Sequence, residues 1–130
     1  MVWYLDTSAF LKLLVAEAES DALQAWLVAH GPIWSSHLLR TEALRASLRL
    51  GIDQLAIDEA LETVSLMLPA VSTFLTAGTL EPPLLRSLDA LHLASALELG
   101  DDLEGLVTYD ARLAGAASAA SVVVVAPGTS

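Results

Sequence analysis

The stretch YLDTSAFLKL, residues 4–13, is the part of this 130-residue sequence that says most about its fold. The apolar residues 2–5 predict a strand that ends at Asp6, and Thr7 or Ser8 can cap the helix that follows. A strand followed directly by a helix is the repeating unit of α/β sheets. In such sheets, functional sites lie beyond the carboxyl ends of the strands. The stretch therefore predicts an α/β fold and places an acidic side chain where such a fold would use it.

The rest of the chain continues the alternation of strands and helices, with Gly or Pro near many of the boundaries. The expected further strands are residues 33–35, 69–71, 106–108 and 122–125. The expected further helices are residues 20–30, 36–50, 53–66 or 58–66, 72–77 and 86–99, and a short alanine-rich helix that starts at 110. This order predicts an α/β protein with a mostly parallel central sheet covered on both faces, a three-layer α/β/α sandwich formed as one domain by residues 1–130.

The composition limits the class of protein. Hydrophobic residues make up 55% of the chain, which is enough for a large core and leaves apolar surface for a dimer or partner interface, with leucines such as Leu38, Leu39 and Leu50 as candidates. Cysteine is absent, so disulfides and thiolate metal sites are excluded. No secretory signal and no membrane-spanning run is expected. We expect a cytoplasmic protein without a membrane partner.

The net charge of −10 argues at first against a nucleic-acid partner, but the positions of the basic residues matter more than their sum. Arg40 lies two residues before Glu42, Arg86 lies three residues before Asp89, and Arg112 lies two residues after Asp110. Positive charge is therefore concentrated around particular acidic motifs. The alternative is that each arginine forms an ordinary surface ion pair.

Four acidic residues occur in distinctive motifs spread over the chain. They are Asp6 in YLDTSAF, Glu42 in RTEALRA, Asp89 in SLDALHLASAL and Asp110 in VTYDARLAGAA. The first and last follow expected strands, and the other two lie within expected helices. Carboxylates from four distant segments would suit a hard divalent cation such as Mg²⁺ or Mn²⁺. Helix capping by Asp6 and Asp110, and simple solvent exposure of Glu42, are the alternatives.

These four segments resemble, in order, the signature segments of PIN-domain ribonucleases, and most closely those of VapC toxins from prokaryotic toxin–antitoxin pairs. The resemblance extends from Tyr4 to Pro127–Gly128, and LDTSAFLKL and LDALHLASAL are its most specific strings. It implies an α/β/α fold and metal-dependent cleavage of RNA. It also implies a homodimer and a small VapB-like antitoxin that masks the site.

The resemblance further implies a role for each candidate residue. Asp6, Glu42, Asp89 and Asp110 would be catalytic and would bind Mg²⁺ or Mn²⁺. Arg112, and with it Arg40 or Arg86, would contact phosphate. Ser8 and Thr108 would hydrogen-bond a ligand carboxylate or a metal-bound water, although capping and turn bonding explain these two hydroxyls equally well. His92 is expected to be a core or interface residue.

The chain departs from the family pattern before its last strand, where a glycine is usual and this sequence has Ala119-Ala120-Ser121. Two other functional classes are compatible with the sequence. One is a non-catalytic PIN-like module that binds proteins, although all four acids are present. The other is a Mg²⁺-dependent phosphotransferase, although the haloacid-dehalogenase type needs a second aspartate two residues after the first, where this chain has Ser8.

Overall fold

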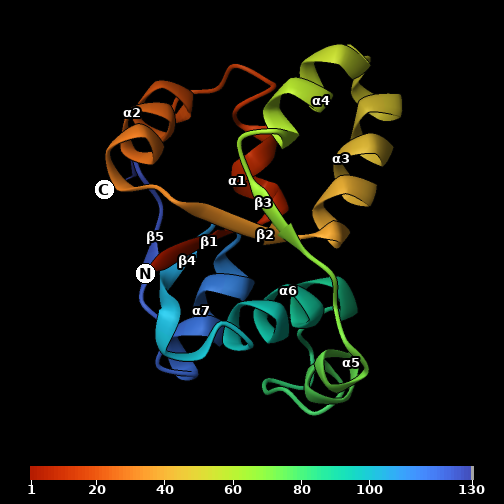
Figure 1. Cartoon of the computed structure of the whole chain (residues 1–130), viewed down its shortest axis with the longest axis vertical. Coiled ribbons are helices and arrows are strands. Elements are labelled where there is room, and N and C mark those ends of the chain that lie inside the picture. Colours follow the sequence, from red (N-terminus) through yellow and green to blue (C-terminus); the bar gives the residue numbers. More distant parts are fainter. Residues whose placement is uncertain (130) are drawn as a thin grey trace.

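The computed structural model describes residues 1–129, in which one sheet lies between two groups of helices (Figure 1). The strands are β1 (Val2–Leu5), β2 (Ile33–Ser36), β3 (Ser65–Met67), β4 (Leu103–Val107) and β5 (Val124–Val125). The helices are α1 (Thr7–Leu11), α2 (Ser20–His30), α3 (His37–Leu50), α4 (Gln54–Leu61), α5 (Val71–Ala77), α6 (Ser87–Leu97) and α7 (Ala111–Ala119), with a 3₁₀ turn at Gly100–Asp102.

The sheet has the strand order β3-β2-β1-β4-β5, and all its pairs are parallel. The chain builds outward from β1 to β3 and then returns to add β4 on the other side of β1. Tyr4 of β1 is paired with Leu106 of β4, and Leu5 with Val107. The order reverses between these two strands, and ligands of α/β sheets bind beyond the carboxyl ends of strands at such a point.

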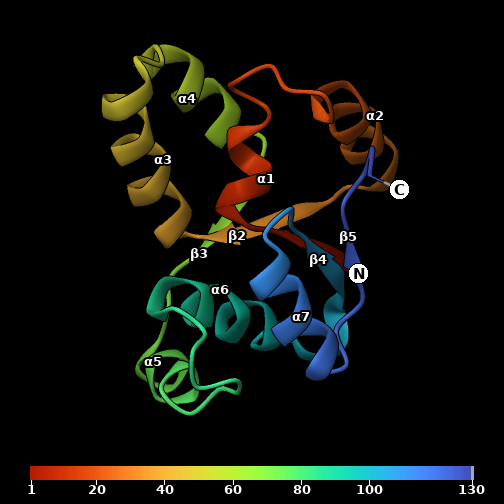
Figure 2. The same cartoon turned by 180° about the vertical axis from the view of Figure 1, so that it is seen from behind.

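The two faces of the sheet support two separate hydrophobic cores. Successive strand residues point to opposite faces, so Leu5 and Val107 pack into one core while Tyr4 and Leu106 pack into the other. Helices α1, α2, α3 and α4 lie on the first side and α5, α6 and α7 on the second (Figure 1, Figure 2). This arrangement confirms the predicted three-layer α/β/α fold, with a sheet that is entirely parallel.

Several expected boundaries were wrong. The third strand is β3, at residues 65–67 rather than 69–71, and the preceding helix ends at Leu61. Leu66 and Met67 extend along β2, whereas Pro69 has no N–H to give to a strand ladder. The expected strand at 122–125 is limited to residues 124–125.

The cap of the first helix is Asp6, which was considered as an alternative, and is neither Thr7 nor Ser8. Asp6 caps α1 through its own side chain, in place of Thr7 or Ser8. Its carboxylate accepts the N–H of Ala9, a bond that an N-cap residue characteristically makes. Ser8, which was expected to cap the helix, instead donates its hydroxyl to the carboxylate of Asp6 and so helps to fix the capping residue.

The unusual turn before β5 has a left-handed residue where glycine would be favoured. Ser121 has φ = 65°, and Val122 N–H donates to the carbonyl of Ala117 (2.9 Å) while Ser121 N–H donates to Ser118 (3.0 Å). This is the Schellman arrangement, in which the left-handed position is usually occupied by Gly. The backbone therefore keeps the turn and accepts a local cost at Ser121.

Ser121→Gly is expected to raise the free energy of unfolding by about 0.5–1 kcal/mol, because glycine adopts this conformation without a Cβ penalty. Ser118→Gly is the matched control and is expected to lower it by a similar amount, since Ser118 lies within α7. Urea denaturation of both variants checks the prediction. Destabilisation by Ser121→Gly would contradict it.

Every helix in residues 1–129 is too short or too polar to cross a lipid bilayer.

Candidate active site

Asp6 is held at the end of β1 by three donors from two strand ends. Its Oδ1 accepts bonds from the N–H of Ala9 (3.0 Å) and the hydroxyl of Ser8 (2.8 Å), and its Oδ2 accepts one from Thr108 (2.6 Å). The residue is 3% exposed. Burial raises the pKa of Asp6, and the bonds from Thr108, Ala9 and Ser8 act against that rise. Its charge is thus stabilised by neutral dipoles, because no Lys or Arg of residues 1–129 forms an ion pair with it.

The two hydroxyls that bind Asp6 also connect it to the loop after β4. Ser8 Oγ accepts the N–H of Tyr109 (3.0 Å), and Thr108 Oγ1 accepts the N–H of Asp110 (3.0 Å). Ser8 and Thr108 therefore fix the spacing between the ends of β1 and β4. Both hydroxyls were predicted to hydrogen-bond a ligand carboxylate, and in the structure both donate to Asp6.

Glu42 comes from α3 and is bound by side chains from two other elements. Its Oε1 accepts a bond from Thr7 Oγ1 (2.8 Å) and one from His92 Nε2 of α6 (2.5 Å). The early turns of α3 lie close to α6 in both views of the fold (Figure 1, Figure 2). Burial alone would raise the pKa of Glu42, but the hydrogen bonds from His92 and Thr7 hold it below its ordinary value.

His92 joins Glu42 to a buried tyrosine on the central strand. Its Nδ1 is 2.8 Å from the hydroxyl of Tyr4, and both residues are almost fully buried. Burial raises the pKa of Tyr4 well above the ordinary value, so its hydroxyl stays protonated and donates to Nδ1. Nε2 then carries the imidazole proton and donates it to Glu42. The hydrogen bonds from Tyr4 to His92 and from His92 to Glu42 therefore fix the orientation of the Glu42 carboxylate.

Asp89 and Asp110 share one guanidinium. Arg86 Nε donates to Asp89 Oδ2 (3.2 Å), and its Nη2 donates to Asp110 Oδ2 (3.3 Å). Asp110 uses its other oxygen to cap α7, where Oδ1 accepts the N–H groups of Arg112 (2.9 Å) and Leu113 (3.0 Å). Capping and cation binding are therefore not alternatives at Asp110, because each uses a different carboxylate oxygen.

Hydrogen bonds and ion pairs link the elements that carry all four acids. Thr108 Oγ1 joins Asp6 to the N–H of Asp110, Arg86 joins Asp110 to Asp89, and Glu42 is bonded to His92, which lies three residues after Asp89 on α6. Side-chain exposure is 15% for Asp89 and 24% for both Glu42 and Asp110, whereas Asp6 is buried. The acids thus form one cluster at the strand ends, with Asp6 at its base and three carboxylates reaching solvent.

The donor chemistry of this cluster fits a hard divalent cation. All four ligand candidates are carboxylates, and a positive group, the Arg86 guanidinium, already lies between two of them. Within residues 1–129, no three Asp, Glu, His or Cys side chains are close enough together to form a complete ligand set for one ion. The four carboxylates fit such a cation by their charge and donor type, and three of them would have to move closer together to ligate one ion.

The other expected basic residues differ in their placement. Arg112 begins α7 beside Asp110, and its guanidinium has no ion-pair partner among residues 1–129. Arg40 is exposed on α3, two positions before Glu42, and residues two apart on a helix do not face the same way. No contact in the described part of the chain joins Arg40 to the acids.

Sequence reasoning missed three residues that orient Glu42, namely Thr7, Tyr4 and His92. Thr7 and Tyr4 flank Asp6 along the chain, yet nothing in their identity shows that they contact Glu42 and His92. A usable signal existed for His92, because it lies three residues after Asp89 and therefore near it on one helix face. Its place as a core residue was anticipated, but its bond to Glu42 was not.

Comparison with known proteins gives one consistent family. A model described as PIN domain matches residues 3–118. The chain is 45% identical to Ribonuclease VapC46 of Mycobacterium tuberculosis over 95% of its own length and 96% of that relative. It is 41% identical to Ribonuclease VapC35 and 35% identical to Ribonuclease VapC47 of the same species, over 96% of each chain.

Proposed function

This chain belongs to the PIN-domain family, and on that premise we propose that it is an endoribonuclease toxin of the VapC type. It would hydrolyse RNA phosphodiester bonds inside the strand and be neutralised by a cognate antitoxin. One observation supports the proposal most: side chains of Thr108, Arg86 and His92 link the segments that carry the four candidate carboxylates. Cleavage of RNA by the purified chain, and its inhibition by the antitoxin protein, is the direct test.

Asp6, Glu42, Asp89 and Asp110 are the residues that would hold Mg²⁺ or Mn²⁺. A bound divalent cation supplies partial neutralisation of the phosphate charge and a more acidic water for hydrolysis. The bridging position of Arg86 supports this assignment, because it marks where positive charge is favoured between Asp89 and Asp110. The three partly exposed carboxylates give solvent a route to the cluster.

The remaining residues would position these ligands and the substrate. Ser8 and Thr108 fix the oxygens of Asp6, and His92 with Thr7 fixes Oε1 of Glu42. The guanidinium of Arg112 has no ion-pair partner among the described residues and lies next to Asp110, so it is suited to a substrate phosphate. Arg86 could turn from its aspartates to the same phosphate, since its side chain is 64% exposed.

Two substitutions of His92 are expected to separate its two contacts. Gln places an amide near the position of Nε2, so His92→Gln can still donate to Glu42, and RNA cleavage is expected to fall only a few-fold. Asn places its amide near Nδ1, so His92→Asn keeps the Tyr4 contact and loses Glu42. Loss of a residue that orients a ligand typically costs roughly 10–100-fold, and His92→Asn is expected in that range.

The measurement is kcat/KM for one RNA at saturating Mg²⁺, followed by a titration of Mg²⁺ for each variant. A positioning role predicts that His92→Asn also needs more Mg²⁺ for half-maximal activity. Equal loss in both variants, with equal loss of thermal stability, would instead assign His92 to core packing alone.

The acidity of the site indicates what the antitoxin should contribute. The chain has a net charge of −10 and its cluster exposes carboxylates, so a basic or aromatic segment would complement the site. We propose a small VapB-like protein with such a segment. Because RNA is the substrate, we place the protein in the cytoplasm.

A homodimer is the proposed assembly, and exposed apolar side chains support it. The exposed apolar residues on and beside α5 are Leu68, Val71, Phe74 and Leu75, each more than half exposed. Leu50 at the end of α3 is also exposed, but Leu39 is fully buried in the core and cannot contribute as expected. A stable interface would bury roughly 1,200 Å² or more, and light scattering of the purified chain tests whether it forms.

A further inference from the structure

A groove of about 1000 Å³ separates α7 from the segment that joins α5 to α6. One wall is formed by residues 81–85, and the other is the face of α7 that carries Arg112, Gly115 and Ala119. The joining segment extends beneath α6 toward α7 in both views of the fold (Figure 1, Figure 2). This groove has no role in the acid cluster itself.

Both walls of the groove begin at the acid cluster. On one side, Arg112 follows Asp110 by two residues, and its backbone N–H is bonded to that carboxylate. On the other side, the segment 81–85 leads directly into Arg86, which is paired with Asp110 and Asp89. A polymer held at the cluster would therefore reach the groove with its next unit.

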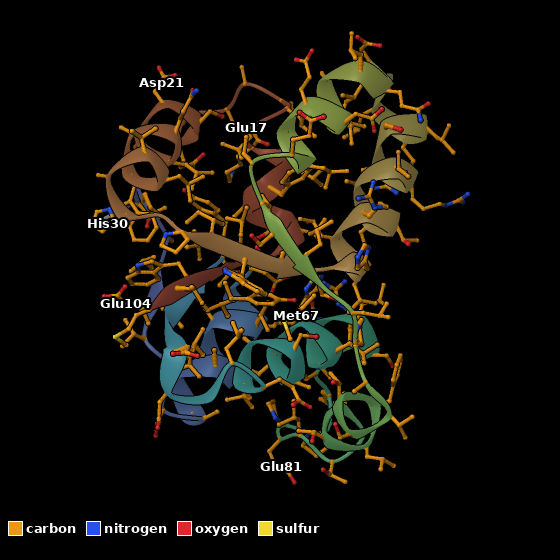
Figure 3. All side chains as sticks on the ribbon, in the orientation of Figure 1. Glu17, Asp21, His30, Met67, Glu81 and Glu104 are labelled. Atoms are coloured by element: carbon orange, nitrogen blue, oxygen red, sulfur yellow. The ribbon has the colours of Figure 1, made fainter. Side chains whose placement is uncertain are left out.

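The walls are largely apolar, and the positively charged side chain of Arg112 lies at the end nearest the cluster. Pro82, Pro83 and Leu84 are exposed, and Leu84 is 90% exposed. The one acidic lining residue, Glu81, points outward from the end of the molecule (Figure 3). Arg112 has no ion-pair partner among residues 1–129. The groove thus presents apolar surface beside one positive charge that has no ion-pair partner among the described residues.

This combination matches single-stranded RNA better than a protein segment. A nucleotide carries an apolar, planar base next to a phosphate. The groove has no aromatic lining residue, so a base would pack on its proline and leucine side chains while Arg112 pairs with the backbone. We infer that the groove binds nucleobases adjacent to the scissile phosphate, with Arg112 on the intervening phosphodiester. The inference rests on the proposed ribonuclease function and deepens it by assigning a base subsite.

Gly115 provides a way to fill the groove without disturbing the fold. It is exposed within α7, and a Cβ at this position would meet no atom within 4 Å. Gly115→Leu should therefore project into the groove without a clash. Leucine also favours a helix over glycine, so the melting temperature should rise by about 3 °C. The matched control is Ser118→Leu, which adds the same side chain to an exposed position of α7 that does not line the groove.

The experiment compares cleavage of one single-stranded RNA by the wild-type chain and these two variants with Mg²⁺. Gly115→Leu is expected to lower kcat/KM roughly tenfold, mainly by raising KM, in spite of its higher melting temperature, and Ser118→Leu to leave it unchanged. The same RNA is then made with a single abasic residue at each position around the mapped cut. An abasic residue at the position held in the groove should lower the kcat/KM of the wild type by a similar factor. The same abasic RNA should lower the kcat/KM of Gly115→Leu very little, because that variant has already lost the contact.

The outcomes distinguish the two levels of the proposal. An inactive wild-type chain would overturn the ribonuclease function, and the base subsite with it. An active wild type with equal cleavage by Gly115→Leu would overturn the subsite alone. Weaker inhibition by the antitoxin protein together with unchanged cleavage would assign the groove to that protein partner and would equally overturn the inference.

Discussion

Asp6→Asn is expected to lower kcat/KM for RNA cleavage by about 100-fold or more while the fold survives. The substitution keeps the size of the side chain and removes one negative charge from the base of the acid cluster. Asparagine still caps a helix through its side-chain oxygen, so the bond to the N–H of Ala9 can persist. The hydroxyls of Ser8 and Thr108 can rotate to accept the new amide N–H groups.

The stability of this variant should move in the opposite direction to its activity. Burial raises the pKa of Asp6, which means that the ionised carboxylate is less stable in the folded chain than in water. A neutral Asn removes that cost at neutral pH, where Asp6 of the unfolded chain is ionised. In buffer with EDTA, Asp6→Asn should therefore melt at the same temperature as the wild type or higher. Circular dichroism melting curves measure this.

Asp53→Asn is the matched control, because Asp53 is also an N-cap whose carboxylate accepts a backbone N–H, at the start of α4. It is exposed and makes no contact with the cluster among the described residues. Its activity should equal that of the wild type. Wild-type activity in Asp6→Asn, at any stability, would remove Asp6 from the site.

The sheet and the position of Asp6 could be predicted because they depend on local patterns. An apolar run that ends at an acidic residue before a helix fixes a strand end, and repetition of strand and helix fixes a parallel sheet. Asp110 follows the same rule after β4. The reversal of strand order between β1 and β4 then makes their ends neighbours, and this placed both aspartates at one edge.

The third strand could not be located in this way. It is three residues long, and only Leu66 and Met67 are partly buried. So short a segment has no clear alternation of apolar and polar residues to distinguish it from the neighbouring residues 69–71. Its position is decided by pairing with β2, a contact between residues about 30 apart in the chain. Local propensity carries no information about such pairing.

The supporting shell of the cluster was also beyond local reasoning. His92 contacts Glu42 and Tyr4, which lie 50 and 88 residues away in the sequence. Arg86 could be paired with Asp89 from their helical spacing, but its second partner, Asp110, is 24 residues away. The acids were visible through their motifs, whereas the residues that orient them are defined only by the tertiary structure.

Removal of divalent cations with EDTA is expected to abolish RNA cleavage, and Mg²⁺ or Mn²⁺ added back should restore it. In the proposed reaction the oxygen of a water molecule bonds to phosphorus as the bond from phosphorus to the 3′ oxygen breaks. The leaving 3′ oxygen takes up a proton, and the products end in a 3′-hydroxyl and a 5′-phosphate. End-group analysis of the cleaved RNA measures this outcome.

A metal-free mechanism would leave different termini on the cleaved RNA. The structure argues against His92, which lies near the cluster, as the general base of such a mechanism. Ribonucleases that use histidine bases activate the 2′-hydroxyl and leave a 2′,3′-cyclic phosphate. His92 is 1% exposed, and its two ring nitrogens are occupied by Tyr4 and Glu42, so it cannot reach a 2′-hydroxyl. Cleavage that persists in EDTA, or cyclic-phosphate ends, would therefore refute the hydrolytic mechanism. Intact RNA under all metal conditions, with antitoxin binding retained, would instead favour a non-catalytic module that binds proteins.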